Sequence, residues 1–489
     1  MSWLILGTTL GIDETSRIFL LFSSILWIAG NTLLPMNKSG SIAGWYLVTM
    51  SASFLVIFAQ DIPTFYMAYA AMSLALFGLI INGSEQSRRA AKIYIVFTMI
   101  GEMLLFAALI MIAHNTNTLD IDNITDRVPQ DILIILLLAG FGIKAGLPLV
   151  HITLPPVYQA LSLAAAIPVA GSLLHLGLYG WLRFLPLGQV TLPYWSFIIL
   201  GFGLFAMFYG ALVGLTQNKA KSLLAYSSIS QMGMMLLLLG IGFSAPSKWH
   251  VIQTSLLLFA LHHALSKGAL FYGLSTQGIH KLALVLPALS LAGLPFTSGA
   301  LAKSALKDQL IFLPELWVSL INWLLPLASI GTTLLMARFL YLCRNSHHSQ
   351  TPKGLYWWLL LMCSLLIPWY WSLQTINIIS IWSGFWPVLA GAVIAYVVYK
   401  GSYQSLFSRT PSIPPGDILI LGEKVLKQSH LSSKTEHNTH QEESDFILGP
   451  QKAPAFIAVP ERYLAKWTNA ISLFLMVLIG LFLFLTDIL

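Results

Sequence analysis

Apolar runs of about twenty residues recur along most of this chain, and they restrict it to one kind of fold. A helix needs about 20 apolar residues to cross a bilayer. The 489 residues are 57% hydrophobic and only 9% charged, whereas soluble domains carry about 25% charged residues. Because hydrocarbon offers the backbone no hydrogen-bond partner, such runs must form helices that satisfy their own peptide groups. We therefore predict an all-α integral membrane protein.

The apolar runs predict about fourteen transmembrane helices. Residues 1–12 are also apolar, but they are too few to span a bilayer alone. The predicted spans are residues 17–35, 42–60, 62–82, 92–114, 131–152, 160–184, 192–216, 220–243, 250–276, 283–311, 316–343, 355–373, 376–400 and 467–487.

The loops predict the direction in which these helices cross the membrane. Lys and Arg gather in loops that follow odd-numbered helices, and the loop after the fourth helix is acidic. Cytoplasmic loops are the ones enriched in Lys and Arg. We therefore expect the odd loops to be cytoplasmic and both termini to be periplasmic, in a bacterial inner (plasma) membrane. The basic residues concerned are Lys38; Arg88, Arg89 and Lys92; Lys219 and Lys221; Lys281; and Arg344 and Lys353.

Two of the predicted helices carry a lysine beside an Ala-Gly-Leu-Pro sequence. Lys144 precedes Pro148 by four residues, and Lys303 follows Pro295 by eight. A charge at the bilayer centre costs about 2.5–3.5 kcal/mol on insertion scales, so it is rarely present without a function. Proline removes a backbone hydrogen bond and interrupts a helix. A broken helix with an ionisable residue at mid-membrane depth is typical of an ion pathway.

These two helices reveal an internal repeat of five helices. Residues 42–184 form the first set and residues 192–343 the second, and each set has its lysine in the fourth helix. An odd number of helices per set makes the second set enter from the opposite side, which predicts an inverted repeat. The remaining parts are an N-terminal segment with the first helix (1–41), two further helices (344–400), a cytoplasmic hydrophilic segment (401–466) and a C-terminal helix (467–489).

Ionisable side chains inside the spans predict a proton relay. No Asp or Glu occurs between Asp131 and Asp308, so we take Glu102 as the carboxylate of this relay. A lysine removed from water releases its proton more readily, and histidine titrates near neutral pH. The predicted relay consists of Glu102, Lys144, His175, Lys267 and Lys303, with Lys221 and His263 as accessory residues and Pro148 and Pro295 as helix breaks.

Structural alternatives exist for these side chains. Lys221 lies near a predicted cytoplasmic surface, where a lysine can extend its amine into water. His175 could be a core histidine that bonds a carbonyl, and we expect His262 and His114 to be structural. His263 and Lys267 are four residues apart and therefore share one helix face.

Several functions are not expected. The chain has two cysteines, Cys343 and Cys363, and neither a dinucleotide fingerprint nor a cysteine cluster. We therefore expect no cofactor, no metal and no redox chemistry in the chain itself. The net charge of +7 reflects basic loops and does not indicate nucleic acid. The hydrophilic segment holds His430, His437 and His440, which we interpret as part of a solvated, flexible linker.

Five sequence segments resemble the antiporter-like subunits shared by respiratory complex I, Mrp cation/proton antiporters and membrane-bound hydrogenases. The segments are GIKAGL (142–147), LLHLGLYGWLR (173–183), KSLLAYSSISQMG (221–233), HALSKGALF (263–271) and LSLAGLP (289–295) through to Lys303. The resemblance covers about residues 15–400. It implies a proton channel made of two half-channels joined by a polar axis. It also implies other membrane subunits as partners, with a redox module or another soluble enzyme as a further candidate.

The resemblance also assigns residues and exposes departures. It matches Lys144 to the family's lysine of the first broken helix, Lys267 to the central lysine and Lys303 to the residue of the second broken helix. His175 falls where the family carries a lysine or histidine. The family's glutamate would fall at Ala70, and our hypothesis is that Glu102 takes its role. The family's Leu-Pro-Asp-Ala-His is replaced here by LPPVY at 154–158.

We therefore predict a proton-translocating, antiporter-like subunit of a multi-subunit membrane complex. One alternative is an Mrp-type cation (Na⁺)/proton antiporter subunit. Another is a membrane partner that supplies proton motive force to a soluble enzyme, for example one that hydrates carbon dioxide. A third is a scaffold that no longer conducts. Whether the parent complex is a redox-driven oxidoreductase stays open, because the chain holds no active site of its own.

Overall fold

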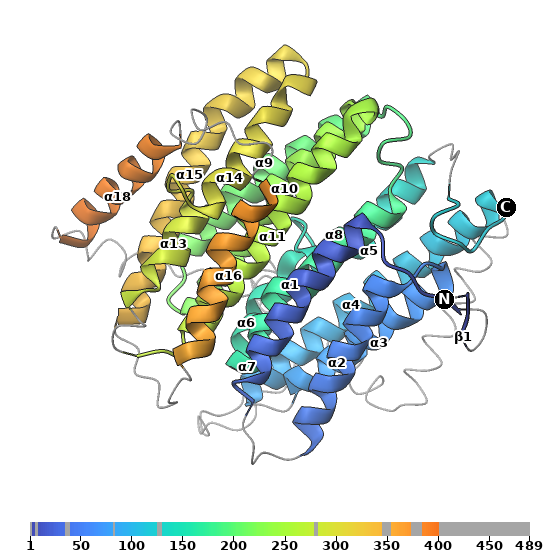
Figure 1. The fold of residues 1–489 in the computed structure, drawn as a ribbon, viewed down its shortest axis with the longest axis horizontal. Coiled ribbons are helices and arrows are strands. Elements are labelled where there is room, and N and C mark those ends of the chain that lie inside the picture. Colours follow the sequence, from blue (N-terminus) through green and yellow to red (C-terminus); the bar gives the residue numbers. More distant parts are fainter. Residues whose placement is uncertain are drawn as a thin grey trace, which may run out of the picture. The chain divides into compact units, whose positions relative to one another are not determined.

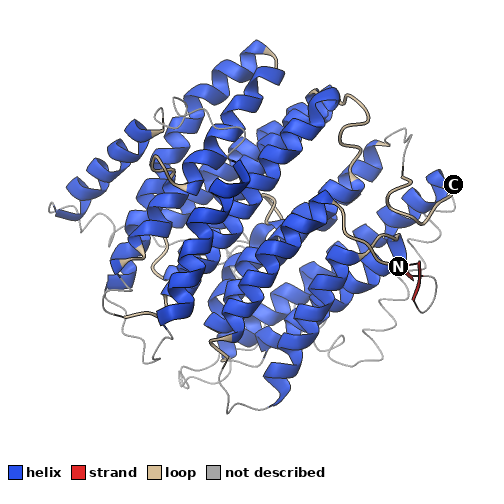
Figure 2. Cartoon of the chain, viewed as in Figure 1, coloured by secondary structure: helices blue, strands red, loops and turns tan. Residues whose placement is uncertain are grey.

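Helices make up nearly all of the chain that the computed structural model describes (Figure 2), namely residues 2–4, 8–34, 40–81, 84–124, 130–277, 282–344, 354–372 and 384–400. These residues belong to the first of two units, Met1–Pro415 and Gly416–Leu489. The predicted hydrophilic segment 401–466 and the predicted helix 467–487 lie outside the described residues. Lys38, Lys281 and Lys353, which contributed to the predicted orientation, also lie outside them.

The helices run in chain order from blue to orange in Figure 1. In chain order they are α1 (Glu14–Asn31), α2 (Gly40–Phe58), α3 (Ile62–Ile81), α4 (Glu85–Thr116), α5 (Asp131–Ala145), α6 (Leu154–Ala160), α7 (Leu163–Pro168), α8 (Leu174–Phe184), α9 (Pro193–Leu215), α10 (Ala220–Ser244), α11 (Trp249–Gly273), α13 (Val285–Ala292), α14 (Ser298–Gln309), α15 (Glu315–Arg344), α16 (Gly354–Ser372) and α18 (Phe385–Lys400). Before them, β1 (Ser2–Leu4) and β2 (Thr8–Thr9) form a short antiparallel hairpin within the apolar N-terminal stretch.

Six of the described helices are long and apolar enough to cross a membrane, which agrees with a multi-pass protein. Shorter apolar helices cover residues 42–58, 354–370 and 385–398. The six are Ile62–Ile81, Glu85–Thr116, Leu163–Phe184, Pro193–Leu215, Ala220–Ser244 and Glu315–Arg344.

α9 and α10 show how these helices are layered. α9 exposes large apolar side chains on one side, including Phe197, Phe205 and Leu212, as expected of a helix that faces lipid. α10 is enclosed on all sides and packs against α6, α9, α11 and α15. The two helices approach closely because Gly203 and Gly233 oppose each other. A Cβ on either glycine would lie within 2.6–2.8 Å of the other's carbonyl oxygen, and such small residues let membrane helices pack backbone to backbone.

Both predicted breaks are present, but glycine and not proline ends each helix. α5 ends at Ala145 and α13 ends at Ala292, each three residues before the proline. The glycine that follows is left-handed in both copies, with φ of 77° at Gly146 and 95° at Gly293. Glycine reaches this conformation without steric cost and caps the helix end. The proline two residues later then lies where the helix has already stopped.

The two breaks share further backbone detail. The leucine after each glycine donates its N–H to a carbonyl five residues back, from Leu147 to Gly142 at 2.8 Å and from Leu294 to Leu289 at 3.1 Å. The residue after each proline also has positive φ, 76° at Leu149 and 63° at Phe296. The same four-residue sequence therefore folds into the same cap at two distant places in the chain.

Candidate functional site

Lys144 lies in the last turn of α5, and its amine meets side chains from α3. Its Nζ donates a hydrogen bond to Ser73 Oγ at 2.5 Å. The amine also lies 3.8 Å from the centre of the Tyr69 ring, where the negative face of the ring attracts a cation. The Lys144 side chain is 11% exposed, so most of its surroundings are protein.

Glu102 of α4 completes this cluster from the opposite side. Its Oε1 accepts a hydrogen bond from Ser73 Oγ at 2.6 Å and lies 4.0 Å from Lys144 Nζ. The other carboxylate oxygen, Oε2, is buried and has no hydrogen-bond partner in the part of the chain that the structure describes. The structure therefore places Glu102 beside Lys144, an arrangement that the hypothesis for Glu102 requires.

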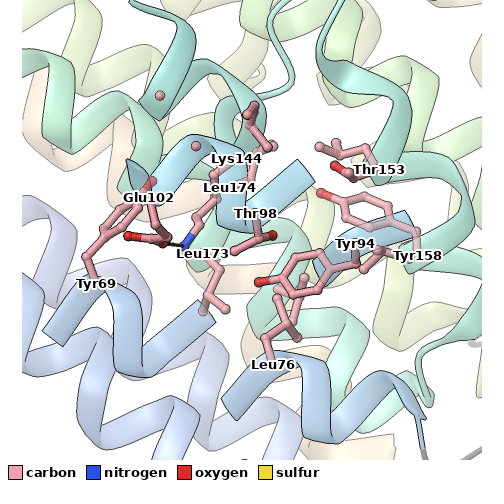
Figure 3. A pocket seen from close by; sticks show the side chains of 16 residues that line it. Tyr69, Leu76, Tyr94, Thr98, Glu102, Lys144, Thr153, Tyr158, Leu173 and Leu174 are labelled. Carbon is pink, nitrogen blue, oxygen red and sulfur yellow. Dashed lines mark ion pairs between the residues drawn. The ribbon is translucent and has the colours of Figure 1, made fainter. Parts of the chain in front are cut away.

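A cavity of about 40 Å³ adjoins the pair (Figure 3). A single water needs only about 10–15 Å³, so the cavity has room for a few waters. Tyr94 and Thr98 of α4 add hydroxyl groups to its wall, while Leu173 and Leu174 line another part. Lys144 and Glu102 can thus exchange protons with each other and with water.

His175 occupies the start of α8, directly after a backbone irregularity. Pro168 ends α7, and residues Val169–Leu173 form the π-helical turn η3. Proline cannot donate to the helix ladder, and π turns recur at functional sites because they shift side chains on a helix face. The His175 ring Nδ1 donates to the Gly171 carbonyl at 2.6 Å, which leaves its Nε2 as an acceptor in the neutral ring.

His263 of α11 forms a hydrogen bond with the other ring nitrogen of His175. Its Nδ1 lies 3.0 Å from His175 Nε2, and since that atom is an acceptor, His263 donates. The His263 Nε2 is then an acceptor, and it is buried without a hydrogen-bond partner among the described residues. Both hydrogen bonds therefore run in the same direction, from His263 to His175 and from His175 to Gly171. The His263 Nε2 at the start of this chain can receive a proton.

Lys267 lies one turn beyond His263 and is completely buried. Its amine donates to the Leu224 carbonyl of α10 at 2.8 Å. α11 therefore places the predicted relay residue Lys267 one turn from the predicted accessory residue His263.

Lys303 of α14 reaches back to the second break. Its amine donates to the Ala292 carbonyl at 2.6 Å and to Ser329 Oγ of α15 at 3.2 Å. A cavity of about 70 Å³ opens beside it and is also lined by Lys307 and Asn322. Among the described residues Lys303 has no carboxylate partner, unlike Lys144.

Lys221 stands apart from these groups. It lies in the first turn of α10 and donates to the Leu161 carbonyl at 2.5 Å, beyond the end of α6. Nothing in the described part of the chain connects it to His175 or Lys267 by a hydrogen bond. The described residues hold no group of three or more His, Cys, Asp or Glu that could bind a metal ion.

The sequence reading passed over two residues that the structure places in these clusters. Ser73 joins Lys144 to Glu102. His262, expected to be structural, bonds Ser298 at the start of α14 at 2.8 Å. Its position beside His263 in the sequence was the only available signal, whereas Ser73 gave none, since serines are common in these helices.

A family model for the transmembrane region of NADH:quinone oxidoreductase and Mrp antiporter subunits matches residues 59–334. This match covers more than half of the chain. It includes the predicted relay and accessory residues, namely Glu102, Lys144, His175, Lys221, His263, Lys267 and Lys303. The chain belongs to this family.

Proteins similar to this chain carry three kinds of name, for an NADH-ubiquinone oxidoreductase, an antiporter and a hydrogenase. The chain is 31% identical to NADH-ubiquinone oxidoreductase chain 4 of Chondrus crispus over 54% of each protein. It is 29% identical to the putative antiporter subunit mnhA2 of Staphylococcus saprophyticus, over 55% of this chain and 38% of that protein. It is 26% identical to hydrogenase-4 component B of Escherichia coli, over 64% of this chain and 51% of that protein. The chain therefore spans about half the length of these relatives or less.

A solved structure supports the fold. The Mrp complex from Dietzia sp. DQ12-45-1b superposes with a TM-score of 0.68 at 17% sequence identity. The likeness covers 88% of this chain and 53% of that one. At this identity it shows the fold of a multi-pass membrane protein and leaves the activity to be argued from the residues.

Proposed function

We propose that this chain is a proton-translocating, antiporter-like subunit of a multi-subunit membrane complex. The observation that carries the proposal is the Glu102–Lys144 pair, 4.0 Å apart and next to a cavity with room for water. A carboxylate and an amine at this distance can trade one proton, and water can deliver it. The relay residues Glu102, Lys144, His175, Lys267 and Lys303 keep the roles predicted for them.

Contacts between the clusters support a path along the protein. His262 bonds Ser298 at the start of α14, the helix that carries Lys303, at 2.8 Å. The next residue of α11, His263, bonds His175 at 3.0 Å. His175 directly follows Leu174, which lines the cavity beside Lys144. We propose that water carries the proton over the remaining gap between His175 and Lys144, since bridging waters are nearly as effective as direct hydrogen bonds.

We also propose the predicted architecture of about fourteen spans with two inverted five-helix repeats, residues 42–184 and 192–343. The matching caps at Gly146 and Gly293 support a repeat, because each falls in the fourth helix of its set. The flanking segments and the periplasmic termini in a bacterial inner membrane follow from the loop charges. Other membrane subunits are proposed partners, since the relatives are named as parts of complex I, an antiporter and a hydrogenase.

Protons are favoured over Na⁺ as the transported ion. Sodium prefers several oxygen ligands, as hard cations do. The Glu102 carboxylate instead has an amine 4.0 Å away and a serine hydroxyl at 2.6 Å. A protonated amine repels a metal cation at that distance, whereas it can donate a proton.

The test is proton flux in vesicles that contain the complex purified with this chain. Lys144→Ala should abolish flux, while the charge-matched control Lys248→Ala, at an exposed position before α11, should leave it unchanged. Equal flux in Lys144→Ala and the native chain would refute the proposal. Flux that requires Na⁺ on one side would replace it with the cation antiporter alternative.

A further inference from the structure

The Ser73 hydroxyl lies between the amine of Lys144 and the carboxylate of Glu102. Ser73 belongs to α3 and is 1% exposed. Its Oγ is 2.5 Å from Lys144 Nζ and 2.6 Å from Glu102 Oε1. The amine and the carboxylate are 4.0 Å apart, which exceeds the 2.7–2.9 Å or so of a direct charge-assisted hydrogen bond. The hydrogen-bonded route between them therefore passes through Ser73.

We propose that Ser73 is a proton-relay residue that carries the proton between Lys144 and Glu102. This inference rests on the proposed function and names the group through which the first transfer occurs. In the forward step an N–H bond of the Lys144 ammonium breaks as that proton bonds to Ser73 Oγ. The original hydroxyl proton of Ser73 passes to Glu102 Oε1. An ammonium and a carboxylate thus become an amine and a carboxylic acid, with the serine unchanged.

A second acceptor gives the hydroxyl two positions. Besides Glu102 Oε1, the Tyr69 carbonyl lies 2.8 Å from Ser73 Oγ. A serine has one hydrogen to donate, so it can satisfy only one of these acceptors at a time. When Glu102 is ionised, its charge draws the hydrogen toward the carboxylate. When Glu102 is protonated, the acid donates to Ser73 Oγ and the serine hydrogen turns to the Tyr69 carbonyl.

This alternation links the direction of the hydroxyl to the charge of Glu102. After each transfer the hydroxyl must rotate before the next proton can pass in the same direction. The unpaired Oε2 of Glu102 and the cavity with its Tyr94 and Thr98 hydroxyl groups then offer the proton an exit to water. A serine that only capped its own helix would need the Tyr69 carbonyl and neither of the other two contacts.

The test compares three variants of the complex in the vesicle flux assay. Ser73→Ala removes the hydroxyl, and Ser73→Thr keeps it. The matched control is Ser53→Ala in α2, another fully buried serine, whose hydroxyl donates to the Met50 carbonyl of its own helix at 2.7 Å. We expect Ser73→Ala to lower flux at least about 10-fold, since a positioned proton-transfer group contributes about 10²–10⁴-fold. Ser73→Thr should stay within a few-fold of the native rate, and Ser53→Ala should match it.

An infrared measurement provides a readout that helix capping would not change. The carbonyl stretch of protonated Glu102, identified by its absence in Glu102→Gln, should move to higher frequency in Ser73→Ala because the acid loses its hydrogen bond. It should stay in place in Ser53→Ala. An unmoved band in Ser73→Ala would show that the serine does not bond the acid and would overturn the relay.

The flux outcomes separate this inference from the proposed function. Flux lost in Lys144→Ala but native in Ser73→Ala would overturn the relay alone. Flux equally low in assembled Ser73→Ala and Ser73→Thr would also overturn it, because the hydroxyl would then be irrelevant. Native flux in Lys144→Ala would overturn the proposed function and the relay with it.

Discussion

Lys303 donates a hydrogen bond to the Ala292 carbonyl oxygen at 2.6 Å, so the lysine of α14 caps the end of α13. The carbonyl end of a helix carries partial negative charge and attracts a cation. Lys144 meets a carboxylate instead, 4.0 Å away on α4. The two broken helices thus provide their lysines with different counter-charges, a full charge in the first set and a helix end in the second.

Lys303→Met should destabilise the second break. The Ala292 carbonyl loses its donor, and an unsatisfied buried polar group costs about 1–3 kcal/mol. Lys303→Gln should cost less, because its amide can still donate. Thermal unfolding of the detergent-purified complex measures the difference, and Lys307→Met, one turn later and exposed, is the control. Equal midpoints for Lys303→Met and Lys307→Met would contradict the capping role.

The two capping glycines should differ in their tolerance of alanine. Both have positive φ, so alanine costs about 1–2 kcal/mol at either position. A Cβ at Gly146 finds its nearest neighbour at 3.5 Å, whereas one at Gly293 meets Lys303 Cδ at 2.9 Å. Gly293→Ala should therefore lower the stability more than Gly146→Ala does, and it should also displace the Lys303 side chain. Unfolding midpoints test the order, and a larger loss in Gly146→Ala would refute it.

The Glu102–Lys144 pair should show strong coupling in a double-mutant cycle. Removing one partner leaves a buried group uncompensated, which costs about 3–5 kcal/mol. Glu102→Leu and Lys144→Met should each be destabilising, and the double variant should cost clearly less than their sum. Denaturation of the three variants and the native chain supplies the coupling energy. Additive losses would mean that the pair does not interact in the membrane.

His263→Asn should separate the structural role of the histidine pair from its transport role. The asparagine amide can replace Nδ1 as the donor to His175 Nε2, 3.0 Å away in the native chain, but it cannot carry a proton onward. We expect near-native stability with loss of flux. His263→Phe leaves the His175 nitrogen unsatisfied and should also cost about 1–3 kcal/mol. Native flux in His263→Asn would remove His263 from the path.

Asp122 should make the stability of the folded protein depend slightly on pH. Burial, opposed by the nearby Arg183 guanidinium, raises the pKa of Asp122 above its ordinary value. The folded protein thus binds the Asp122 proton more tightly than the unfolded chain does. The stability that this proton contributes is lost as pH rises through the raised pKa. Asp122→Asn should therefore be slightly more stable than the native chain at neutral pH and equal to it below about pH 4.

The size of this effect is limited by exposure, since the Asp122 side chain is 63% exposed and water screens its charge. We expect the free energies of unfolding of Asp122→Asn and the native chain to differ by less than about 1 kcal/mol. Unfolding midpoints at several pH values between about 4 and 7 provide the measurement. A lower midpoint for Asp122→Asn at neutral pH would show that the 3.6 Å ion pair with Arg183 outweighs the cost of burial.

Helix ends illustrate where sequence reasoning falls short. The helix that contains the predicted span 92–114 begins seven residues before that span, because α4 starts at Glu85 with Ser84 as its cap. The first two turns of α4 are charged, so hydropathy alone excluded them from the predicted span. Ser84 followed by Glu85 is nevertheless a recognisable helix start. The predicted breaks were placed at the prolines, whereas the helices end at the preceding glycines, since a left-handed residue closes a helix before a proline can.

Sequence alone determined the membrane class, the two breaks and the candidate ionisable residues. These depend on local composition: a charge in an apolar run is costly wherever the helices pack, and Ala-Gly-Leu-Pro carries its own capping geometry. Only the tertiary structure decided which side chains meet. Lys144 reaches Ser73 across 71 residues, and His175 reaches His263 across 88. Each helix residue turns its side chain by about 100° relative to the last, so such pairs depend on how packing rotates whole helices, which no local pattern records.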